Sequence, residues 1–406
     1  MSAYLDHAAS TPMRPEAIEA MQPWLRDQHA NPSGAHRLAR QARRALDEAR
    51  DAVADALGAE PGEVVFTSGG TEADNLAVFG VHDRRGGRLV ASAVEHHAVL
   101  DPVRARDGRV VGVDGRGVID LEALASALDD DVTLVSVMLA NNEVGSCQPL
   151  DDVAALVRRR APGATLHTDA VQAVSWVDVA GASRPADLVS ISAHKFGGPK
   201  GVGALVVRRG TPLAPRQVGG GQERERRGGT QDVAGIVAMA TAIRLTVDQR
   251  AATVERVGRL RDRLADGLRA EIPDALETAA PDGDRAGLTA GLCHLCIPGI
   301  ESEALLFLLE QADVSAAAAA SCASGAMEPS HVLAAMGIPR DLAFGSLRLS
   351  LGWCSTDAEV DLALEVIPPA VARLRRFSST DRTVAATDPP VGPSAGPSVG
   401  PSVGQA

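Results

Sequence analysis

The feature that most constrains the fold is an alternation, from residue 60 to about 210, between short runs rich in Val, Ile and Leu and longer amphipathic stretches. The apolar runs lie at 63–66, 88–92, 133–138, 164–167, 187–191 and 203–207. A strand that is apolar throughout is buried on both faces, and such strands alternating with helices are typical of a parallel sheet covered by helices. The sequence therefore predicts an α/β fold with a mostly parallel sheet.

Polar residues follow these predicted strands at the points where the strands end. In sheets of this kind, ligands bind beyond the carboxyl ends of the strands. The polar residues at these ends are Thr67, Ser68 and Thr71, then Glu95 and His96, Asn141 to Glu143, Asp169, and His194 with Lys195. We therefore expect one functional site along this edge of the sheet.

Composition and pattern divide the chain into four parts. We expect an N-terminal segment at 1–15, a large domain at 16–255 that holds the sheet, and a smaller α/β domain at 256–377. Residues 378–406 are rich in Pro, Gly, Ser and Thr, and such a segment buries too little apolar surface to order itself. We predict that they form a disordered tail.

Charge and composition exclude several classes of protein. The net charge is −12 and the arginine clusters are short, which argues against direct nucleic-acid binding. No uncharged apolar run reaches the roughly 18 residues of a membrane span, and the first residues lack the pattern of a signal peptide. We expect a cytoplasmic protein with no membrane contact. Five cysteines in 406 residues do not make a disulfide framework.

The cysteine spacing gives no metal site. Cys293 and Cys296 are three residues apart, but their segment is strand-like. In a strand, residues at i and i+3 point to opposite faces. We therefore predict that the pair does not bind a metal, since there is no second pair beside it.

The segment 67–75 follows a predicted strand and opens a predicted helix. Its glycines allow the backbone to approach an anion, and the free amides at the start of a helix bind phosphate. The Ser and Thr residues also suit an ordinary capped helix, so both interpretations stand. The segment is not a Walker loop, because no lysine follows the glycines.

Two further strand ends carry chemistry that complements a phosphate loop. Lys195, in the glycine-rich segment 192–201, suits Schiff-base chemistry if its neutral amine is accessible, although a solvated lysine in a surface loop is the alternative. Asp169 suits a partner for a pyridinium nitrogen, although a helix-capping aspartate is equally common. The three features together are much more specific than any one of them.

The chain resembles cysteine desulfurases of the NifS/IscS type. The motifs that carry the resemblance occur in the family's order, at 6–12, 31–36, 67–75, 95–99, 141–145, 167–172, 192–203, 219–223, 227–230, 321–325, 328–330 and 347–352. The resemblance covers about residues 3–376. It implies the type I fold of pyridoxal-phosphate enzymes, with a large domain and a smaller C-terminal α/β domain, and pyridoxal 5′-phosphate as cofactor.

The resemblance also implies roles for individual residues. Lys195 carries the cofactor and moves the substrate α-proton, Asp169 partners the pyridine nitrogen, and His96 stacks on the ring. The remaining cofactor contacts are the phosphate cradle of Gly70, Thr71, Ser192 and His194, the ring-oxygen ligands Asn142 and Gln172, and Thr230, which reaches a neighbouring subunit's phosphate in a homodimer. Asn142 and Arg348 contact the substrate, and an arginine pairs well with a carboxylate.

Cys322 lies in a run of small residues, which suits a nucleophile that must move, although a buried structural cysteine is the common alternative. The resemblance implies that Cys322 takes sulfur from L-cysteine as a persulfide, with release of L-alanine. It further implies an acceptor protein for iron–sulfur assembly or another thiolation pathway, and transient iron–sulfur ligation by Cys322. A selenocysteine lyase, an aminotransferase and a non-catalytic scaffold remain as alternatives.

Overall fold

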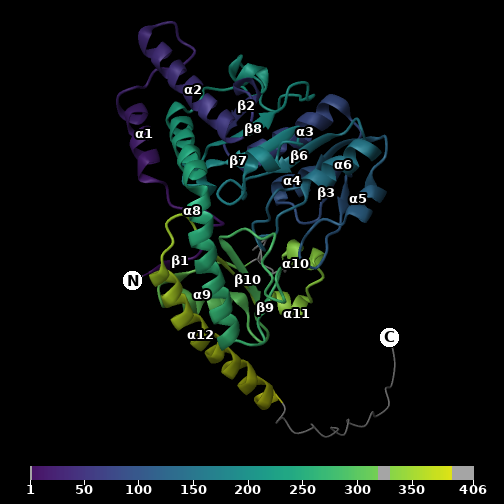
Figure 1. The fold of residues 1–406 in the computed structure, drawn as a ribbon, viewed down its shortest axis with the longest axis vertical. Coiled ribbons are helices and arrows are strands. Elements are labelled where there is room, and N and C mark those ends of the chain that lie inside the picture. Colours follow the sequence, from purple (N-terminus) through teal and green to yellow (C-terminus); the bar gives the residue numbers. More distant parts are fainter. Residues whose placement is uncertain (1, 319–329, 386–406) are drawn as a thin grey trace, which may run out of the picture.

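The computed structural model describes residues 2–318 and 330–385, and Figure 1 shows two layered units joined by one long helix. The upper unit in Figure 1 contains a seven-stranded sheet in the order β2-β8-β7-β6-β5-β3-β4. Its strands are β2 (Val64–Thr67), β3 (Arg88–Ser92), β4 (Arg109–Val111), β5 (Val132–Ser136), β6 (Thr165–Asp169), β7 (Leu188–Ser192) and β8 (Gly203–Val207). The predicted α/β architecture with a mostly parallel sheet is confirmed.

One strand of this sheet runs against the others. β8 pairs antiparallel with both β7 and β2, whereas the remaining pairs are parallel. Only residues 193–202 connect β7 to β8, and a parallel crossover needs a dozen or more residues. The short connection also holds Lys195 directly beyond the end of β7, in a 3₁₀ turn at Ala193–Lys195.

Neighbouring residues within each strand face two different helix layers. Leu134, Leu188 and Leu205 pack on α3 (Gly70–Arg85) and α4 (His97–Arg104). Val135 and Val189, which follow Leu134 and Leu188 along their strands, face the other layer. This layer is formed by α2 (Arg37–Ala56), α6 (Leu150–Arg160) and the first half of α8 (Val233–Glu271). Burial on both faces explains why these strands are apolar throughout.

The second unit is built on a three-stranded antiparallel sheet in the order β12-β10-β9. Its elements are β9 (Leu276–Glu277), β10 (Leu292–Cys296), β12 (Ser346–Ser350), α9 (Ser302–Glu310), α10 (His331–Ala335), α11 (Arg340–Ala343) and α12 (Asp357–Ala385). Strand β1 (Ala3–Tyr4) pairs with β11 (Val314–Ser315), so the N-terminal segment packs with this unit. The other helices are α1 (Pro15–Arg26), α5 (Leu121–Ala127) and α7 (Val179–Ala182).

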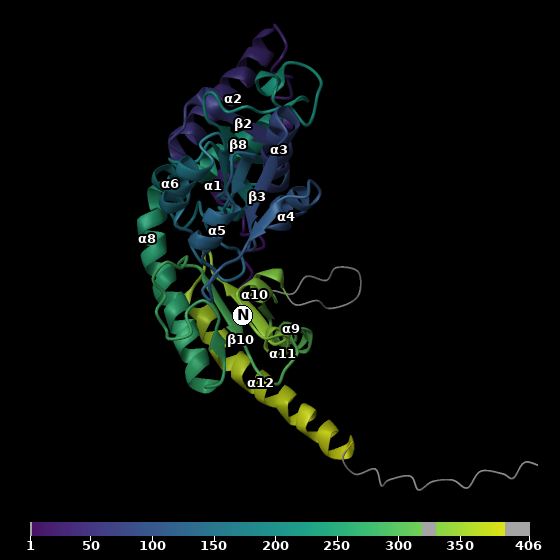
Figure 2. The same cartoon turned by 90° about the vertical axis from the view of Figure 1, so that its right-hand side faces the viewer.

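Helix α8 is 39 residues long and packs in both units. Its first half, from Ile236 to Ile243, lies in the core of the large unit, and its second half, from Val257 to Leu268, lies in the core of the small unit. The predicted domain boundary at residue 255 therefore falls within this helix. Figure 2 shows α8 running along one side of both units.

Helix α12 extends beyond the predicted end of the small domain. The boundary expected at residue 377 falls within this helix, which continues to Ala385. Residues 378–385 contain no Pro or Gly, and the first proline of the tail is Pro389, so nothing breaks the helix at 377. Residues 386–406 lie outside the described part of the chain. Within that part, no helix is long and apolar enough to cross a lipid bilayer.

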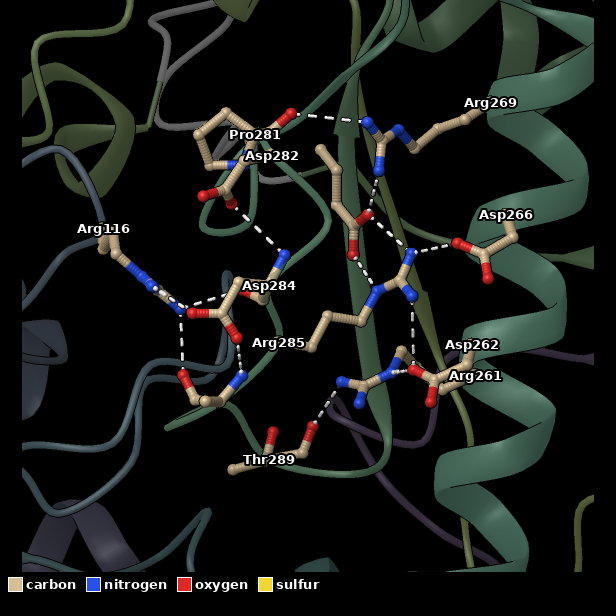
Figure 3. Close-up of polar contacts among 12 residues, drawn as sticks. Arg116, Arg261, Asp262, Asp266, Arg269, Pro281, Asp282, Asp284, Arg285 and Thr289 are labelled. Carbon is tan, nitrogen blue, oxygen red and sulfur yellow. Dashed lines mark hydrogen bonds and ion pairs between the residues drawn. The ribbon is translucent and has the colours of Figure 1, made fainter.

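A polar network fixes the loop at 282–289 between the two units (Figure 3). Arg285 donates to both carboxylate oxygens of Glu277 at 2.6 and 2.8 Å and to Asp266 of α8 at 2.6 Å. On the other side of the loop, Arg116 of the large unit binds the Asp284 carboxylate at 3.2 Å and the carbonyl oxygens of Asp284 and Ala286 at 2.9 Å.

Candidate active site

A cavity of about 400 Å³ lies at the carboxyl ends of the strands of the large sheet. Most of the side chains singled out in the sequence line this one cavity, namely Gly70, Thr71, His96, Asn142, Asp169, Gln172, Ser192, His194, Lys195 and Arg348. The expectation of a single site at this edge of the sheet therefore agrees with the geometry. Cys322, in contrast, falls outside the described residues.

Lys195 is held by the N-terminal segment. Its Nζ atom donates hydrogen bonds to the carbonyl oxygens of Ala8 at 2.5 Å and Ala9 at 3.0 Å. Burial, together with the positive charge of Arg348, lowers the pKa of Lys195 to about 8, against the opposing effect of Asp169. About a tenth of this amine is therefore neutral, and thus nucleophilic, at pH 7.

Asp169 ends β6 and is almost fully buried, with 5% of its surface exposed. Its Oδ1 atom accepts a hydrogen bond from the backbone N–H of Val171 at 2.8 Å. Burial raises the pKa of Asp169 to about 6, although the Val171 N–H and the charge of Lys195 oppose the shift. This carboxyl group is therefore suited to bind a cationic N–H group inside the cavity.

His96 caps the N-terminus of α4. Its Nδ1 atom accepts a hydrogen bond from the backbone N–H of Ala98 at 3.1 Å, so the neutral ring carries its proton on Nε2. Burial and the nearby charge of Lys195 lower the pKa of His96. The geometry therefore presents a neutral imidazole to the cavity.

The start of α3 forms a narrow cradle beside the cavity. A Cβ atom at Gly70 would lie 2.8 Å from Cγ2 of Val171, so glycine is the residue that fits here. His194 lies at the same end, where burial and the charges of Lys195 and Lys200 lower its pKa to about 4. Free backbone amides at a helix start and nearby cations favour an anion at this place.

Arg348 lies in the middle of β12 and reaches across to the large unit. It donates to Asp6 Oδ1 at 2.9 Å and to the carbonyl oxygen of Asn142 at 3.2 Å. Its Nε atom is buried and has no partner among the described residues. Only 9% of the residue is exposed, so Arg348 is a buried arginine that faces the cavity and not the solvent.

Thr230 is exposed and does not line the cavity. It follows a short turn in which Glu223, Arg224 and Glu225 have positive φ angles of 46°, 56° and 63°. A bidentate ion pair between Arg50 and Glu223, at 2.7 and 2.9 Å, holds this turn although its backbone is unfavourable. The segment before Thr230 therefore has a fixed shape at the surface.

Sequence reasoning missed one buried acid at the site, Asp74, and gave no individual role to Glu95 and Glu143, which stand at the strand ends. Asp74 lines the cavity from α3, Glu95 is fully buried beside His96, and Glu143 accepts a hydrogen bond from Ser330. Burial raises the pKa of Glu95 to about 8 and that of Glu143 to about 7. The available signal for Asp74 was an acid on the apolar face of a predicted helix.

The two strand cysteines face opposite sides of β10, as predicted. Cys293 packs in the core shared with α8 and α12, whereas Cys296 packs against Met138 and Val332. Burial raises the pKa of the Cys293 thiol to about 12 and that of Cys296 to about 11. Both side chains are therefore unreactive packing groups.

The sheet, the strand-end aspartate and the lysine beyond β7 define a class of α/β enzymes, and the comparison with known families agrees. Residues 3–363 match the family described as aminotransferase class-V, and the chain belongs to this family.

Within the family, the chain is similar to cysteine desulfurases. It is 46% identical to the "IscS-like cysteine desulfurase" of Mycobacterium tuberculosis over 92% of this chain and 97% of that protein. A solved "NifS-like protein" superposes with a TM-score of 0.85 at 34% identity, covering 92% of this chain and all of the other. The structure of "SspA in complex with cysteine" superposes with a TM-score of 0.74 at 29% identity, covering 87% of this chain and all of the other. The resemblance drawn from the motifs is confirmed.

The residues of the cavity fit pyridoxal 5′-phosphate, the cofactor of this family. The cradle at Gly70 suits a phosphate, and Asp169 suits a protonated ring nitrogen. Gln172 Oε1 is buried and lacks a hydrogen-bond partner in the described part of the chain. A buried carbonyl oxygen of this kind needs a donor, and a hydroxyl group on the cofactor ring would supply one.

Proposed function

We propose that the chain is a cysteine desulfurase that uses pyridoxal 5′-phosphate to convert L-cysteine to L-alanine and a persulfide on Cys322. The observation that carries the proposal is the single cavity lined by Lys195, Asp169, His96 and Arg348. The names of the relatives support the activity, and the cysteine bound in the SspA structure supports the substrate.

The cofactor, when bound, withdraws electrons from the substrate carbon. The chain's own groups would hold it in place: the cradle of Gly70, Thr71, Ser192 and His194 would bind the phosphate, and Asp169 would retain the proton on the ring nitrogen. His96 would offer its Nε2–H to the bound group, and Asn142 and Gln172 would bind the ring oxygen.

Lys195 and Arg348 act on the substrate. The guanidinium of Arg348 binds the carboxylate of L-cysteine with its free N–H groups, because two of its contacts, to Asp6 and Asn142, leave Nε unused. The neutral amine of Lys195 accepts the α-proton, for which a pKa of about 8 is well placed.

The Cys322 thiolate then attacks the substrate sulfur. A sulfur–sulfur bond forms while the carbon–sulfur bond breaks, and the electron pair of that bond stays with the carbon fragment, which leaves as alanine after protonation. The persulfide passes to an acceptor protein for iron–sulfur assembly or another thiolation pathway, with transient iron–sulfur ligation by Cys322.

Two further parts of the proposal concern assembly and location. The fixed turn before the exposed Thr230 supports a homodimer in which Thr230 serves the phosphate of the neighbouring subunit. A cytoplasmic location suits a catalytic thiol, because the cytosol keeps cysteines reduced.

The test is a comparison of the purified holoenzyme with Cys322→Ser. We expect the variant to retain the visible absorbance of the bound cofactor but to lose alanine release from L-cysteine. Undiminished alanine release by the variant would refute the role of Cys322. Steady keto-acid production without sulfide would favour an aminotransferase. A preference for selenocysteine over cysteine would favour a selenocysteine lyase. Absence of cofactor absorbance would favour a non-catalytic scaffold.

A further inference from the structure

The N-terminal segment makes a tight turn at residues 6–10 that reaches the cavity. The backbone N–H groups of Ala9 and Ser10 both donate to the carbonyl oxygen of Asp6, at 3.1 and 3.3 Å. Ala8 and Ala9, in the middle of the turn, line the cavity. Their carbonyl oxygens accept the hydrogen bonds from Lys195 Nζ, at 2.5 and 3.0 Å. We call this pair of oxygens the carbonyl site.

Tyr4 closes the turn. Its hydroxyl group lies 2.8 Å from the carbonyl oxygen of Ser10, to which it donates, and 3.2 Å from that of Asp6. The hydroxyl therefore bridges the two ends of the turn. The backbone of Tyr4 lies in β1, which pairs with β11 of the small unit, so the turn is tied to a strand that is itself held in place.

Residues of β12 hold the same turn from the small unit. Ser350 Oγ accepts a hydrogen bond from the backbone N–H of Ala8 at 2.8 Å and donates to the carbonyl oxygen of Leu5 at 3.3 Å. Asp6 Oδ1 accepts a hydrogen bond from Arg348 at 2.9 Å. The carbonyl site thus has a fixed position, because polar side chains on both sides of it hold the backbone that forms it.

The number of hydrogens on Nζ decides what the carbonyl site can bind. A neutral lysine amine has two N–H groups and one lone pair, whereas an ammonium group has three N–H groups. Two carbonyl oxygens take two N–H groups and leave the lone pair of the neutral amine free. A nitrogen that is doubly bonded to the cofactor carries at most one hydrogen, so it cannot donate to both oxygens. The carbonyl site therefore matches a lysine that is not bonded to the cofactor.

We propose that the carbonyl site is where the Lys195 amine docks after L-cysteine has displaced it, and that Tyr4 and Ser350 are the positioning residues that hold this site. With both N–H groups bonded, the amine cannot rotate about the Cε–Nζ bond, and its lone pair keeps one direction. The α-carbon of the substrate gives its proton to Nζ, and the electron pair of that bond stays with the carbon. Nζ becomes an ammonium group that still donates to both oxygens.

The inference rests on the proposed function, in which Lys195 carries the cofactor and moves this proton. It assigns a role to the turn at 6–10, whose two alanines have no polar side chain of their own. Tyr4 and Ser350 act only through the backbone of this turn, since their hydroxyl groups contact the turn and not Lys195.

The first experiment measures how tightly the cofactor-free protein takes up pyridoxal 5′-phosphate, by absorbance titration. Only the free amine donates to both oxygens, so a looser carbonyl site disfavours the free amine more than the cofactor-bound lysine. Tyr4→Phe removes the hydroxyl alone and should lower the dissociation constant of the cofactor about 2- to 10-fold, the range that one hydrogen bond contributes. A merely structural role of Tyr4 would change the constant in the opposite direction, and weaker cofactor binding in Tyr4→Phe would overturn the proposal.

The second experiment observes the amine itself in the cofactor-free protein. The chain has only two lysines, Lys195 and Lys200, so nuclear magnetic resonance of protein with isotope-labelled lysine resolves each amine. Near pH 6 the Lys195 amine is protonated, because its pKa is about 8. We expect its hydrogens to exchange slowly with water, those of the exposed Lys200 to exchange fast, and Tyr4→Phe to speed the exchange at Lys195 about 2- to 10-fold. Unchanged exchange at Lys195 in Tyr4→Phe would refute the carbonyl site.

Two further variants make the result specific. Ser350→Ala removes the partner of the Ala8 N–H and should change both measurements in the same direction as Tyr4→Phe, which keeps the proposal testable if one variant does not fold. Thr133→Val is the matched control: Thr133 Oγ1 also donates to a backbone carbonyl, that of Gly86 at 2.6 Å, but at the opposite end of β5 from the cavity. Equal effects of Thr133→Val and Tyr4→Phe would contradict a specific role for the turn.

The failure of this inference differs from the failure of the proposed function. If Tyr4→Phe leaves the amine exchange unchanged while the holoenzyme releases alanine from L-cysteine, the carbonyl site is refuted and the proposed function stands. If the amine exchange responds as expected but the protein takes up no pyridoxal 5′-phosphate, the proposed function is refuted, and the role of the site in turnover is refuted with it.

Discussion

At the scale of single residues, the use of lysine is informative. The sequence contains 38 arginines but only two lysines, Lys195 and Lys200, and both lie in the segment after β7. Arginine serves wherever a permanent positive charge is sufficient, since it does not lose its proton in proteins. A neutral amine can come only from lysine, and Lys195 is buried where its pKa falls to about 8.

Lys195→Arg should abolish the visible absorbance of the holoenzyme and reduce alanine formation by about 10² to 10⁴-fold, because no neutral amine remains to accept a proton. The measurements are the absorbance spectrum and an alanine assay. Lys200→Arg, the matched control five residues away, should keep the visible band. Borohydride reduction followed by peptide mapping should place the cofactor mass on Lys195, and its appearance on Lys200 would contradict the assignment.

The charge of Arg348 and the shape of its guanidinium have separable effects. Arg348→Gln should raise the pKa of Lys195, because a nearby positive charge that disfavours the ammonium form is gone. The pH at which cofactor addition to the cofactor-free protein becomes half-maximal should therefore rise, by up to about 1 unit.

Arg348→Lys provides the comparison. It keeps the positive charge, so the pH midpoint of cofactor addition should stay close to that of the wild type. An ammonium group, however, cannot pair bidentately with a carboxylate. We therefore expect a raised KM for L-cysteine in both variants. Equal midpoints for Arg348→Gln and the wild type would show that Arg348 does not tune Lys195.

At the scale of elements, the loop at 282–289 connects α8 to the cavity wall. Arg285 joins this loop to Glu277 and Asp266, and the backbone of Gly287 and Thr289 pairs with that of Cys147 and Gly145. The residues at 141–147 carry Asn142. The network around Arg285 (Figure 3) therefore supports, through this backbone pairing, the segment that carries Asn142.

Arg285→Met should destabilise the protein by about 3 to 5 kcal/mol, because Glu277 is 4% exposed and would keep a buried charge without its main partner. Denaturant unfolding monitored by circular dichroism measures the change. Arg263→Met is the control: this arginine also pairs with acids, but its side chain is 45% exposed, so a loss below about 1 kcal/mol is expected. Similar losses for the two variants would contradict a special role for the loop network.

At the scale of the whole molecule, the cavity depends on contacts between distant parts of the chain. The N-terminal segment pairs with the small unit through β1 and β11, and its Ala8 and Ala9 carbonyls then meet Lys195 of the large unit. Arg348 reaches from the small unit to Asp6 and Asn142. The single long helix α8, packed in both cores, keeps the two units in register.

Much of this architecture follows from local pattern. The strands β2, β3, β5, β6, β7 and β8 lie within one or two residues of the apolar runs in the sequence. The short strands β1, β9 and β11 were not predicted, because two residues show no periodicity. Helix α12 also runs past the change in composition at residue 378, since a shift in composition is not the same as a helix-breaking residue.

The sequence by itself determined which segments become buried strands and which polar residues stand at their carboxyl ends, because side-chain periodicity and strand direction are local properties. Only the tertiary structure decided that Asp6 meets Arg348 across 342 residues, that Asp74 and Asp169 line one cavity, and that the pKa of Lys195 falls to about 8. Pairing between distant segments depends on how layers pack, and ionisation depends on how much water packing removes. Neither quantity is encoded in a short stretch of residues.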